Sequence, residues 1–296
     1  MFQVDAFSDK LFGGNPAGVV LDASRLPDEQ MLNIAREMNL SETAFVTGIE
    51  HDCYNIRFFT PVCEVDLCGH ATIATFYTLA KEGLIKKMNT GIKTIYQKTK
   101  AGKLSVDIVF NNGEVDKVIM EQTTPKDIGK LEDIYSLCKV FGIEIEDIGV
   151  LNESIFPEII STGLPDIILP IKDKKVLDNL SIDMKALAKL SEELEVVGVH
   201  AFCLPKIDSD IVYTRNFAPL VDINEEAATG TSNGALIYFL KKNKLIKNNE
   251  IVSYQGYIMN RPSKIYCKLE ERNDTKVKVG GQAIIVFKGD ILLNQP

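Results

Sequence analysis

The chain has 296 residues and a formal net charge of −8, with 45% apolar and 25% charged residues. At about 150 residues per domain, this length suggests two domains of ordinary globular composition. The acidic excess, without any Lys/Arg-rich cluster, argues against nucleic acid and anionic membranes as partners. The sequence also lacks the 18 consecutive apolar residues that a membrane-spanning helix requires.

The beginning of the sequence lacks a basic segment followed by an apolar core, as a secretory signal would have, so we expect a cytoplasmic protein. Reduced thiols are then expected for the six scattered cysteines, which are Cys53, Cys63, Cys68, Cys138, Cys203 and Cys267. Cys63, Cys68 and His70 lie close together, but the further cysteines of a closed zinc site are missing. We therefore expect no bound metal.

Helix and strand patterns alternate through the first half of the chain. Pro27 opens a stretch whose apolar residues recur at helical spacing. Gly69 opens a second helix that is apolar on nearly all sides and must therefore be buried on most of its surface. The predicted elements are a helix from 27 to about 39, strands over 43–47 and 55–60, a helix over 69–81 and a strand over 104–110.

The second half repeats this order. It contains a predicted helix over 183–193, strands over 196–203 and 211–217, and another helix apolar nearly all round over 230–242. The Gly14-Asn15-Pro16 turn has a counterpart in Gly163-Leu164-Pro165, and the offset grows from 149 there to 161 at the buried helices. We interpret this order as a duplicated fold. Such signals also recur in any protein with both helices and strands, which is the alternative interpretation.

Five motifs along the chain together resemble those of the phenazine-biosynthesis (PhzF-like) isomerase family. They are Phe12-Gly13-Gly14-Asn15-Pro16-Ala17-Gly18, Leu40-Ser41-Glu42-Thr43-Ala44-Phe45-Val46, Leu67-Cys68-Gly69-His70-Ala71-Thr72, Ala228-Thr229-Gly230-Thr231, and Gln255-Gly256 with Arg261-Pro262-Ser263. The resemblance covers essentially the whole chain. It implies an α+β fold of the diaminopimelate epimerase type, with two pseudo-symmetric domains that are each a β-barrel around a central helix.

The resemblance also implies the domain boundaries and the assembly. The N-terminal domain would span 1–118 and be joined by the C-terminal strand 282–296, and the C-terminal domain would span 119–281. The active site of such proteins lies in the cleft between the domains, and homodimers are usual.

Glu42 matches the proton shuttle of the family's Ser-Glu-Thr motif. On the rim of a partly apolar pocket a carboxylate loses hydration, so we expect a pKa raised above its usual value of about 4.3. Without the resemblance, a glutamate after a helix is most often a solvated surface charge. His70 matches the family's histidine, which helps to hold the substrate and stabilise developing charge. The helix dipole there favours a neutral ring, and a structural cap is the alternative role.

Both buried helices begin with a Gly-containing turn, whose free N–H groups can receive an anion. The predicted substrate-binding residues are Asn15, Gly69, Ala71, Gly230, Thr231 and Ser232. Alternatively, these glycines only relieve packing where a helix enters a barrel. The second turn departs from the family's Asp-Pro-Ala-Thr-Gly-Ser, because Glu226, Ala227 and Thr231 replace its aspartate, proline and serine. We predict Glu226 as a third catalytic residue, although it also suits a helix N-terminus on structural grounds.

Racemases of this fold use two cysteines on opposite faces of the substrate. Cys68 holds the first place by resemblance, but Thr229 holds the second, and its hydroxyl is too weak an acid or base. The sequence therefore favours a cofactor-independent isomerase that moves a proton within a small unsaturated carboxylate, with Glu42 as general acid/base. The alternatives are an epimerase or racemase that uses Glu42 with a different partner acid, and a non-catalytic binding protein.

Overall fold

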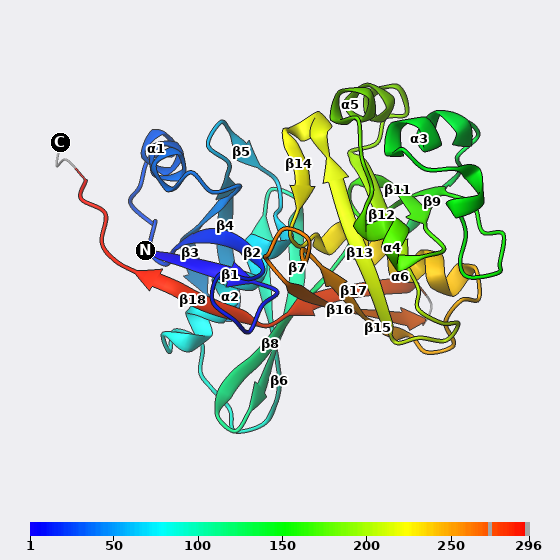
Figure 1. Ribbon diagram of the computed structural model, residues 1–296. Coiled ribbons are helices and arrows are strands. Elements are labelled where there is room, and N and C mark those ends of the chain that lie inside the picture. The colour runs from blue at the N-terminus through cyan, green and yellow to red at the C-terminus, as the bar shows by residue number, and fades with distance from the viewer. Residues whose placement is uncertain (272–273, 294–296) are drawn as a thin grey trace. The chain divides into compact units, whose positions relative to one another are not determined.

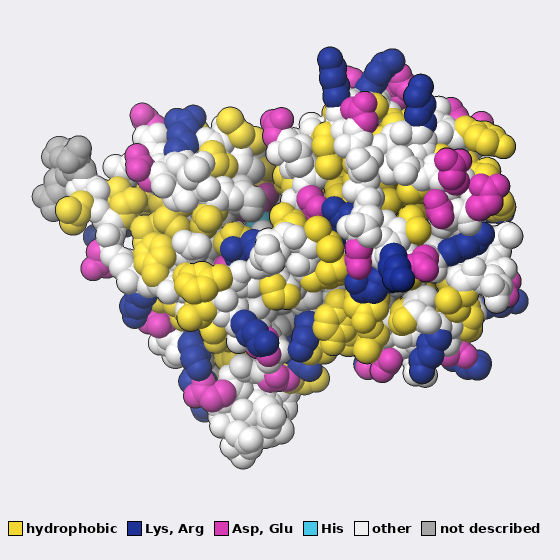
Figure 2. Space-filling view, in the orientation of Figure 1, with side chains coloured by type: hydrophobic (Ala, Val, Ile, Leu, Met, Phe, Trp, Pro, Cys, Tyr) yellow, Lys and Arg dark blue, Asp and Glu magenta, His cyan; other side chains and the backbone are white. Residues whose placement is uncertain are grey.

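The computed structural model describes residues 1–271 and 274–293, and its contacts divide the chain into two compact units. Unit 1 consists of Met1–Glu121 with Gly280–Pro296, and unit 2 of Gln122–Val279. Within the described ranges, every helix is too short or too polar to cross a bilayer. On the face shown in Figure 2, acidic and basic side chains are interspersed over both units, in keeping with the modest net charge of −8.

Unit 1 is a set of strands arranged around one buried helix (Figure 1). Its elements are β1 (Phe2–Ala6), β2 (Asn15–Val20), α1 (Asp28–Met38), β3 (Thr43–Glu50), β4 (Cys53–Phe59), β5 (Glu64–Val65), α2 (Gly69–Lys81), β6 (Gly91–Thr99), β7 (Gly102–Asn111), β8 (Glu114–Glu121) and β18 (Ala283–Lys288). The helix α2 contacts β1, β2, β3, β7, β8 and β18, and ten of its thirteen residues are buried. This is the burial that its all-round apolar sequence predicts.

Unit 2 is built in the same way. Its strands are β9 (Lys126–Lys130), β10 (Glu158–Ser161), β11 (Pro165–Pro170), β12 (Gly198–Cys203), β13 (Ile211–Ala218), β14 (Ile223–Glu226), β15 (Glu250–Gln255), β16 (Ser263–Glu271) and β17 (Thr275–Gly281), whose last two residues belong to unit 1. Its helices are α3 (Ile134–Phe141), η1 (Ile145–Asp147), α4 (Lys174–Asp178), α5 (Met184–Glu193), η2 (Pro219–Val221) and α6 (Gly230–Lys242). The central helix α6 contacts β10, β11, β12, β15 and β16, and nine of its thirteen residues are buried.

The strand pairings repeat between the units. In unit 1, β2 pairs in parallel with β3, β3 antiparallel with β4, β4 in parallel with β6, and β6 antiparallel with β7. In unit 2, the strands β11, β12, β13, β15 and β16 follow the same alternation of parallel and antiparallel pairs. The predicted duplication is thus present in the order of the elements and in their hydrogen bonding.

Candidate functional site

The backbone at Glu42 is fixed by the end of a helix and the start of a strand. The helix α1 stops because Asn39 adopts a left-handed conformation with φ 49°. The chain then enters β3, and the Gly18 N–H donates to the Glu42 carbonyl at 3.1 Å. A Cβ at position 18 would lie 2.6 Å from Thr43 Oγ1, so the parallel approach of β2 to β3 requires glycine there. The side chain of Glu42 is 17% exposed and therefore does not extend into bulk water.

His70 lies in the first turn of the buried helix α2, whose N-cap residue is Cys68. The side chain of this N-cap residue makes no capping hydrogen bond. The His70 ring is nearly enclosed, with its side chain 6% exposed. Gly69 beside it is partly exposed, whereas Ala71 is fully buried. The predicted contact of Ala71 with a substrate therefore stays a prediction, because the whole residue is enclosed.

Three side chains converge on the His70 ring. Glu42 Oε2 lies 3.1 Å from His70 Nε2, and Ser41 Oγ lies 3.2 Å from the same nitrogen. Cys68 Sγ lies 3.4 Å from Nδ1 and 3.9 Å from Nε2 of the same ring. The buried Oε2 of Glu42 makes no hydrogen bond to the described residues beyond this ion-pair contact. This oxygen therefore keeps a lone pair that can accept a proton.

The protonation states of this pair differ from the sequence-based expectation. Burial works to raise the pKa of Glu42, but the charge of the adjacent His70 and hydrogen bonding to it outweigh burial, so the pKa lies below the ordinary 4.5. Burial opposes the imidazolium of His70, yet its contacts with Cys68 and Glu42 raise its pKa well above 6.5, and at neutral pH the charged partner is the Glu42 carboxylate. The predictions of a raised pKa for Glu42 and a neutral ring for His70 are therefore both wrong. The contact between Glu42 and His70 at 3.1 Å has a larger effect on the two pKa values than desolvation and the helix dipole have. The resting pair is therefore a Glu42 carboxylate and a His70 imidazolium.

Cys68 is a thiol in this environment. Burial, and secondarily the Glu42 carboxylate, raises its pKa to about 11, so it holds its proton at neutral pH. Donor atoms of Glu42, Cys68 and His70 all lie within 4.8 Å of one another and could hold a metal ion. A metal would first have to displace the protons of both the imidazolium and the thiol. The exposed Cys63 does not belong to this group.

In unit 2 a buried glutamine organises the turn that precedes α6. Thr229 Oγ1 donates to Glu226 Oε2 at 2.6 Å, and Gln255 Nε2 donates to the Glu226 carbonyl at 2.8 Å. Gln255 Oε1 in turn accepts from Asn233 Nδ2 at 2.9 Å. Glu226 is therefore held beside the N-cap residue of α6, with its side chain only partly exposed.

The predicted binding residues of the two units have different surroundings. Asn15, at the start of β2, is 5% exposed. Gly230 is buried, and the carbonyl of the partly exposed Thr231 accepts from Thr162 Oγ1 at 2.7 Å. The sequence predicts that Ser232 admits a ligand to the helix N-terminus, but its hydroxyl is buried and lies 2.5 Å from Asp166 Oδ2. Ser232 is thus buried as a whole residue with its hydroxyl engaged by Asp166, and its role in substrate binding stays a prediction.

Asp166 gives a test of this interior contact. Burial raises the pKa of Asp166 to about 6, so the folded state binds its proton more tightly than the unfolded chain, where the value is 3.8. The stability that comes from this proton is complete below pH 3.8 and is lost as the pH rises through 6. We expect Asp166→Asn to gain about 1–2 kcal/mol over wild type in unfolding free energy between pH 4.5 and pH 8.

In the Asp166→Asn variant, Oδ1 can accept from the Gly198 N–H and Nδ2 can donate to Ser232 Oγ. Urea unfolding at the two pH values measures the difference. Asp9→Asn, at an exposed aspartate, is the control and should show no such gain. A difference between Asp166→Asn and wild type that is the same at both pH values would contradict the assignment.

Two kinds of residue near the site are given no role by the sequence, although Gln255 stands in one of the quoted motifs. Ser41 belongs to the quoted motif, but its contact with His70 depends on the turn between α1 and β3. Gln97 and Gln255 are fully buried and each lies beside the start of a central helix, where Gln97 Oε1 accepts from Thr72 Oγ1 at 3.1 Å. The signal that could have found them is their spacing, because Gln255 lies 158 positions after Gln97.

Comparison with known proteins places these features in context. Residues 4–289 match a family model described as phenazine biosynthesis-like protein. The chain is 36% identical to an uncharacterised isomerase of Clostridium acetobutylicum, over 99% of this chain and 98% of that protein. It is 30% identical to the trans-2,3-dihydro-3-hydroxyanthranilate isomerase of Pseudomonas chlororaphis, over 98% of each. The crystal structure of a PhzF-family protein of Bacillus anthracis superposes with a TM-score of 0.84 at 30% identity, over 99% of this chain and 98% of that one.

Proposed function

Because the chain belongs to the phenazine biosynthesis-like (PhzF) family and several relatives are named isomerases, we propose that it moves a proton within a small unsaturated carboxylate, with Glu42 as general acid/base. The observation that carries this proposal is the contact between Glu42 Oε2 and His70 Nε2 at 3.1 Å in a nearly enclosed setting. No cofactor is required for such a transfer.

The proposed reaction conserves all atoms and electrons. The Glu42 carboxylate removes a proton from a carbon that is acidified by a neighbouring carbonyl, enamine or diene. Negative charge spreads over the conjugated system and is stabilised by the His70 imidazolium, which also holds the Glu42 side chain in place. The carboxylic acid of Glu42, whose proton exchanges with solvent, then delivers a proton to another carbon of the same system. General acid/base catalysis of this kind contributes roughly 10²–10⁴-fold to a rate.

The residues of unit 2 are proposed to recognise the substrate. Glu226 and Thr231 retain the carboxylate and hydroxyl chemistry of the family positions that they occupy, and the turn at Gly230 offers backbone N–H groups to a substrate carboxylate. Glu226 is about one methylene longer than an aspartate, which favours a substrate that differs in shape from the one named for the Pseudomonas relative.

An epimerase that uses Glu42 with a different partner acid is the second candidate. Its second proton would have to reach the opposite face of the substrate, and His70 cannot supply it there, because its Nε2 is in direct contact with Glu42 at 3.1 Å. A two-thiol racemase is disfavoured, because the pKa of Cys68 is raised to about 11 and the matching position before α6 is Thr229. The third candidate, a binding protein without activity, would need neither proton.

Incubation in deuterated water separates these candidates. The first substrate to test is trans-2,3-dihydro-3-hydroxyanthranilate, followed by other small cyclic unsaturated carboxylates. We expect deuterium at one new carbon of the product, as detected by NMR and mass spectrometry. Deuterium at an inverted stereocentre would indicate the epimerase, and bound but unlabelled substrate would indicate the binding protein. Either result would overturn the proposed isomerisation.

A further inference from the structure

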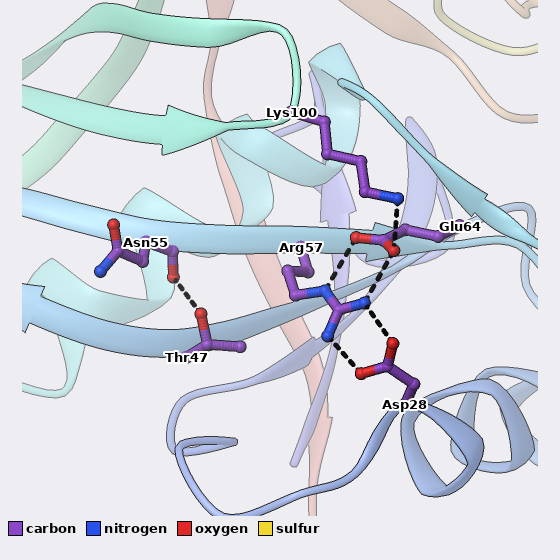
Figure 3. A network of polar contacts seen from close by, with 6 residues as sticks. All are labelled: Asp28, Thr47, Asn55, Arg57, Glu64 and Lys100. Carbon is purple, nitrogen blue, oxygen red and sulfur yellow. Dashed lines mark hydrogen bonds and ion pairs between the residues drawn. The ribbon is translucent and has the colours of Figure 1, made fainter.

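Arg57 on β4 joins three segments of unit 1 (Figure 3). Its Nε and Nη2 donate to the two carboxylate oxygens of Glu64 at 2.8 and 2.7 Å, and Nη1 donates to Asp28 Oδ1 at 2.6 Å. Lys100 Nζ approaches the same Glu64 at 2.7 Å. The side chain of Glu64 is 11% exposed, whereas that of Asp28 is 77% exposed. The pair with Glu64 is therefore shielded from solvent and the arm to Asp28 is not.

Arg215 on β13 makes the equivalent arrangement in unit 2. Its Nε and Nη2 donate to the two oxygens of Glu225, both at 2.8 Å, and Nη1 donates to the Leu177 carbonyl at the end of α4 at 3.0 Å. The two side chains are 8% and 15% exposed. Both guanidinium groups also lie over a phenylalanine ring of their own strand, Phe59 at 5.1 Å and Phe217 at 4.9 Å.

The two pairs occupy matching places in the duplicated fold. Arg215 lies 158 positions after Arg57, the same interval that separates the buried glutamines Gln97 and Gln255. Each glutamate lies four residues before the N-cap residue of the central helix, so that Glu64 precedes Cys68 and Glu225 precedes Thr229. The arginine–glutamate contact thus uses the same donor atoms at equivalent positions of both units, and we regard it as a feature of the duplicated fold.

The segments that the two glutamates hold are those that carry the proposed site. Glu64 lies on β5, which leads through Cys68 to His70. Glu225 directly precedes Glu226 on β14, and because neighbouring side chains of a strand point to opposite faces, fixing Glu225 fixes the direction of Glu226. A bidentate guanidinium–carboxylate contact sets orientation as well as distance, which a lysine cannot do.

We propose that Arg57–Glu64 and Arg215–Glu225 are positioning pairs that hold the His70 turn and the Glu226 strand in reactive geometry. This proposal rests on the proposed function in one respect, which is that His70 and Glu226 take part in the reaction. The positioning itself can be measured without a substrate.

The first test is the NMR titration of the His70 ring in the full chain, with His51 and His200 as internal references. The titratable groups that act on His70 are Glu42 and Cys68. In Glu64→Gln, the turn at Cys68 is released and His70 moves away from Glu42, so its pKa should fall by about one unit. Arg57→Lys keeps the positive charge but loses the bidentate contact with Glu64, and it should lower the His70 pKa by the same amount.

Asp28→Asn is the matched control, because it removes the same charge from the same guanidinium on the exposed side. It should leave the His70 titration unchanged. An equal decrease of the His70 pKa in Asp28→Asn would show that the effect comes from net charge. An unchanged His70 pKa in Glu64→Gln or Arg57→Lys would show that the turn at Cys68 does not need the pair. Either result would overturn the proposal for unit 1.

The second test measures turnover in unit 2 variants. Glu225→Gln should lower kcat roughly 10–100-fold, with KM changed less, because misplacement of a catalytic group by about 1 Å has an effect of this size. Leu137→Ala removes a fully buried side chain on α3 and should lower Tm while keeping kcat per folded molecule. If Glu225→Gln loses activity only in proportion to its folded fraction, the pair is merely structural.

The two proposals fail in different ways. If Glu42→Gln retains activity, the proposed chemistry is wrong, but a fall of the His70 pKa in Glu64→Gln would still establish the positioning pair of unit 1. If the His70 titration is unaffected by Glu64→Gln while Glu42→Gln is inactive, the chemistry stands and the positioning pair is refuted.

Discussion

Replacement of Glu42 by glutamine is expected to lower kcat by about 10²–10⁴-fold, with KM changed much less. Glutamine has the same shape and keeps a hydrogen-bonding oxygen near His70, but it can neither accept nor return a proton at neutral pH. In wild type the carboxylate is ready to act as a base, because the pKa of Glu42 lies below 4.5. Initial-rate kinetics on the substrate found by deuterium labelling would measure this loss.

Glu37→Gln provides the matched control for this variant. Glu37 is an exposed glutamate on the same helix that leads to Glu42, and its removal should leave kcat at the wild-type value. Circular dichroism and Tm would confirm that both variants fold. A Glu42→Gln enzyme that turns over within about threefold of wild type would remove Glu42 from the mechanism, since a general acid/base contributes at least about 10²-fold.

The largest effect on stability is expected from Phe76→Ala in the centre of α2. Phe76 is fully buried, and its ring lies edge-on to Tyr54 at 5.5 Å between centroids. Truncation removes the aromatic contact and leaves a cavity in the core of unit 1, so the free energy of unfolding should fall by about 3–5 kcal/mol. Urea unfolding followed by circular dichroism would measure this loss.

Lys81→Ala at the end of the same helix serves as the comparison. Lys81 forms an exposed ion pair with Glu114, and the loss of such a pair should cost less than about 1 kcal/mol. A loss for Phe76→Ala as small as that for Lys81→Ala would mean that α2 is not packed as described.

The elements with strong local signals were predictable from sequence. Residues 69–81 and 230–242 form helices with the predicted bounds, because apolar residues on every side leave only a buried helix as a stable solution. The predicted α+β, diaminopimelate epimerase-like fold and the isomerase class are confirmed by the family match and the related structures. The motif around Glu42 could be recognised because its residues are consecutive.

The electrostatics of the site could not be predicted in the same way. Glu42 and His70 are 28 positions apart, so nothing local shows that their side chains approach within 3.1 Å. From burial alone the pKa of Glu42 should rise, and from the helix dipole alone that of His70 should fall. The direct contact reverses both directions. The arginine–glutamate pairs were missed for a similar reason, because each joins different elements of its unit.

The central claim is that Glu42 and His70 act as one proton-transfer pair, and a double-mutant cycle on kcat tests it most directly. Glu42→Gln, His70→Asn and the double variant would be compared with wild type under saturating substrate. If the two groups act as a unit, the double variant should be no slower than the slower single variant. Losses that multiply in the double variant would show that the two side chains act independently, and would contradict the claim.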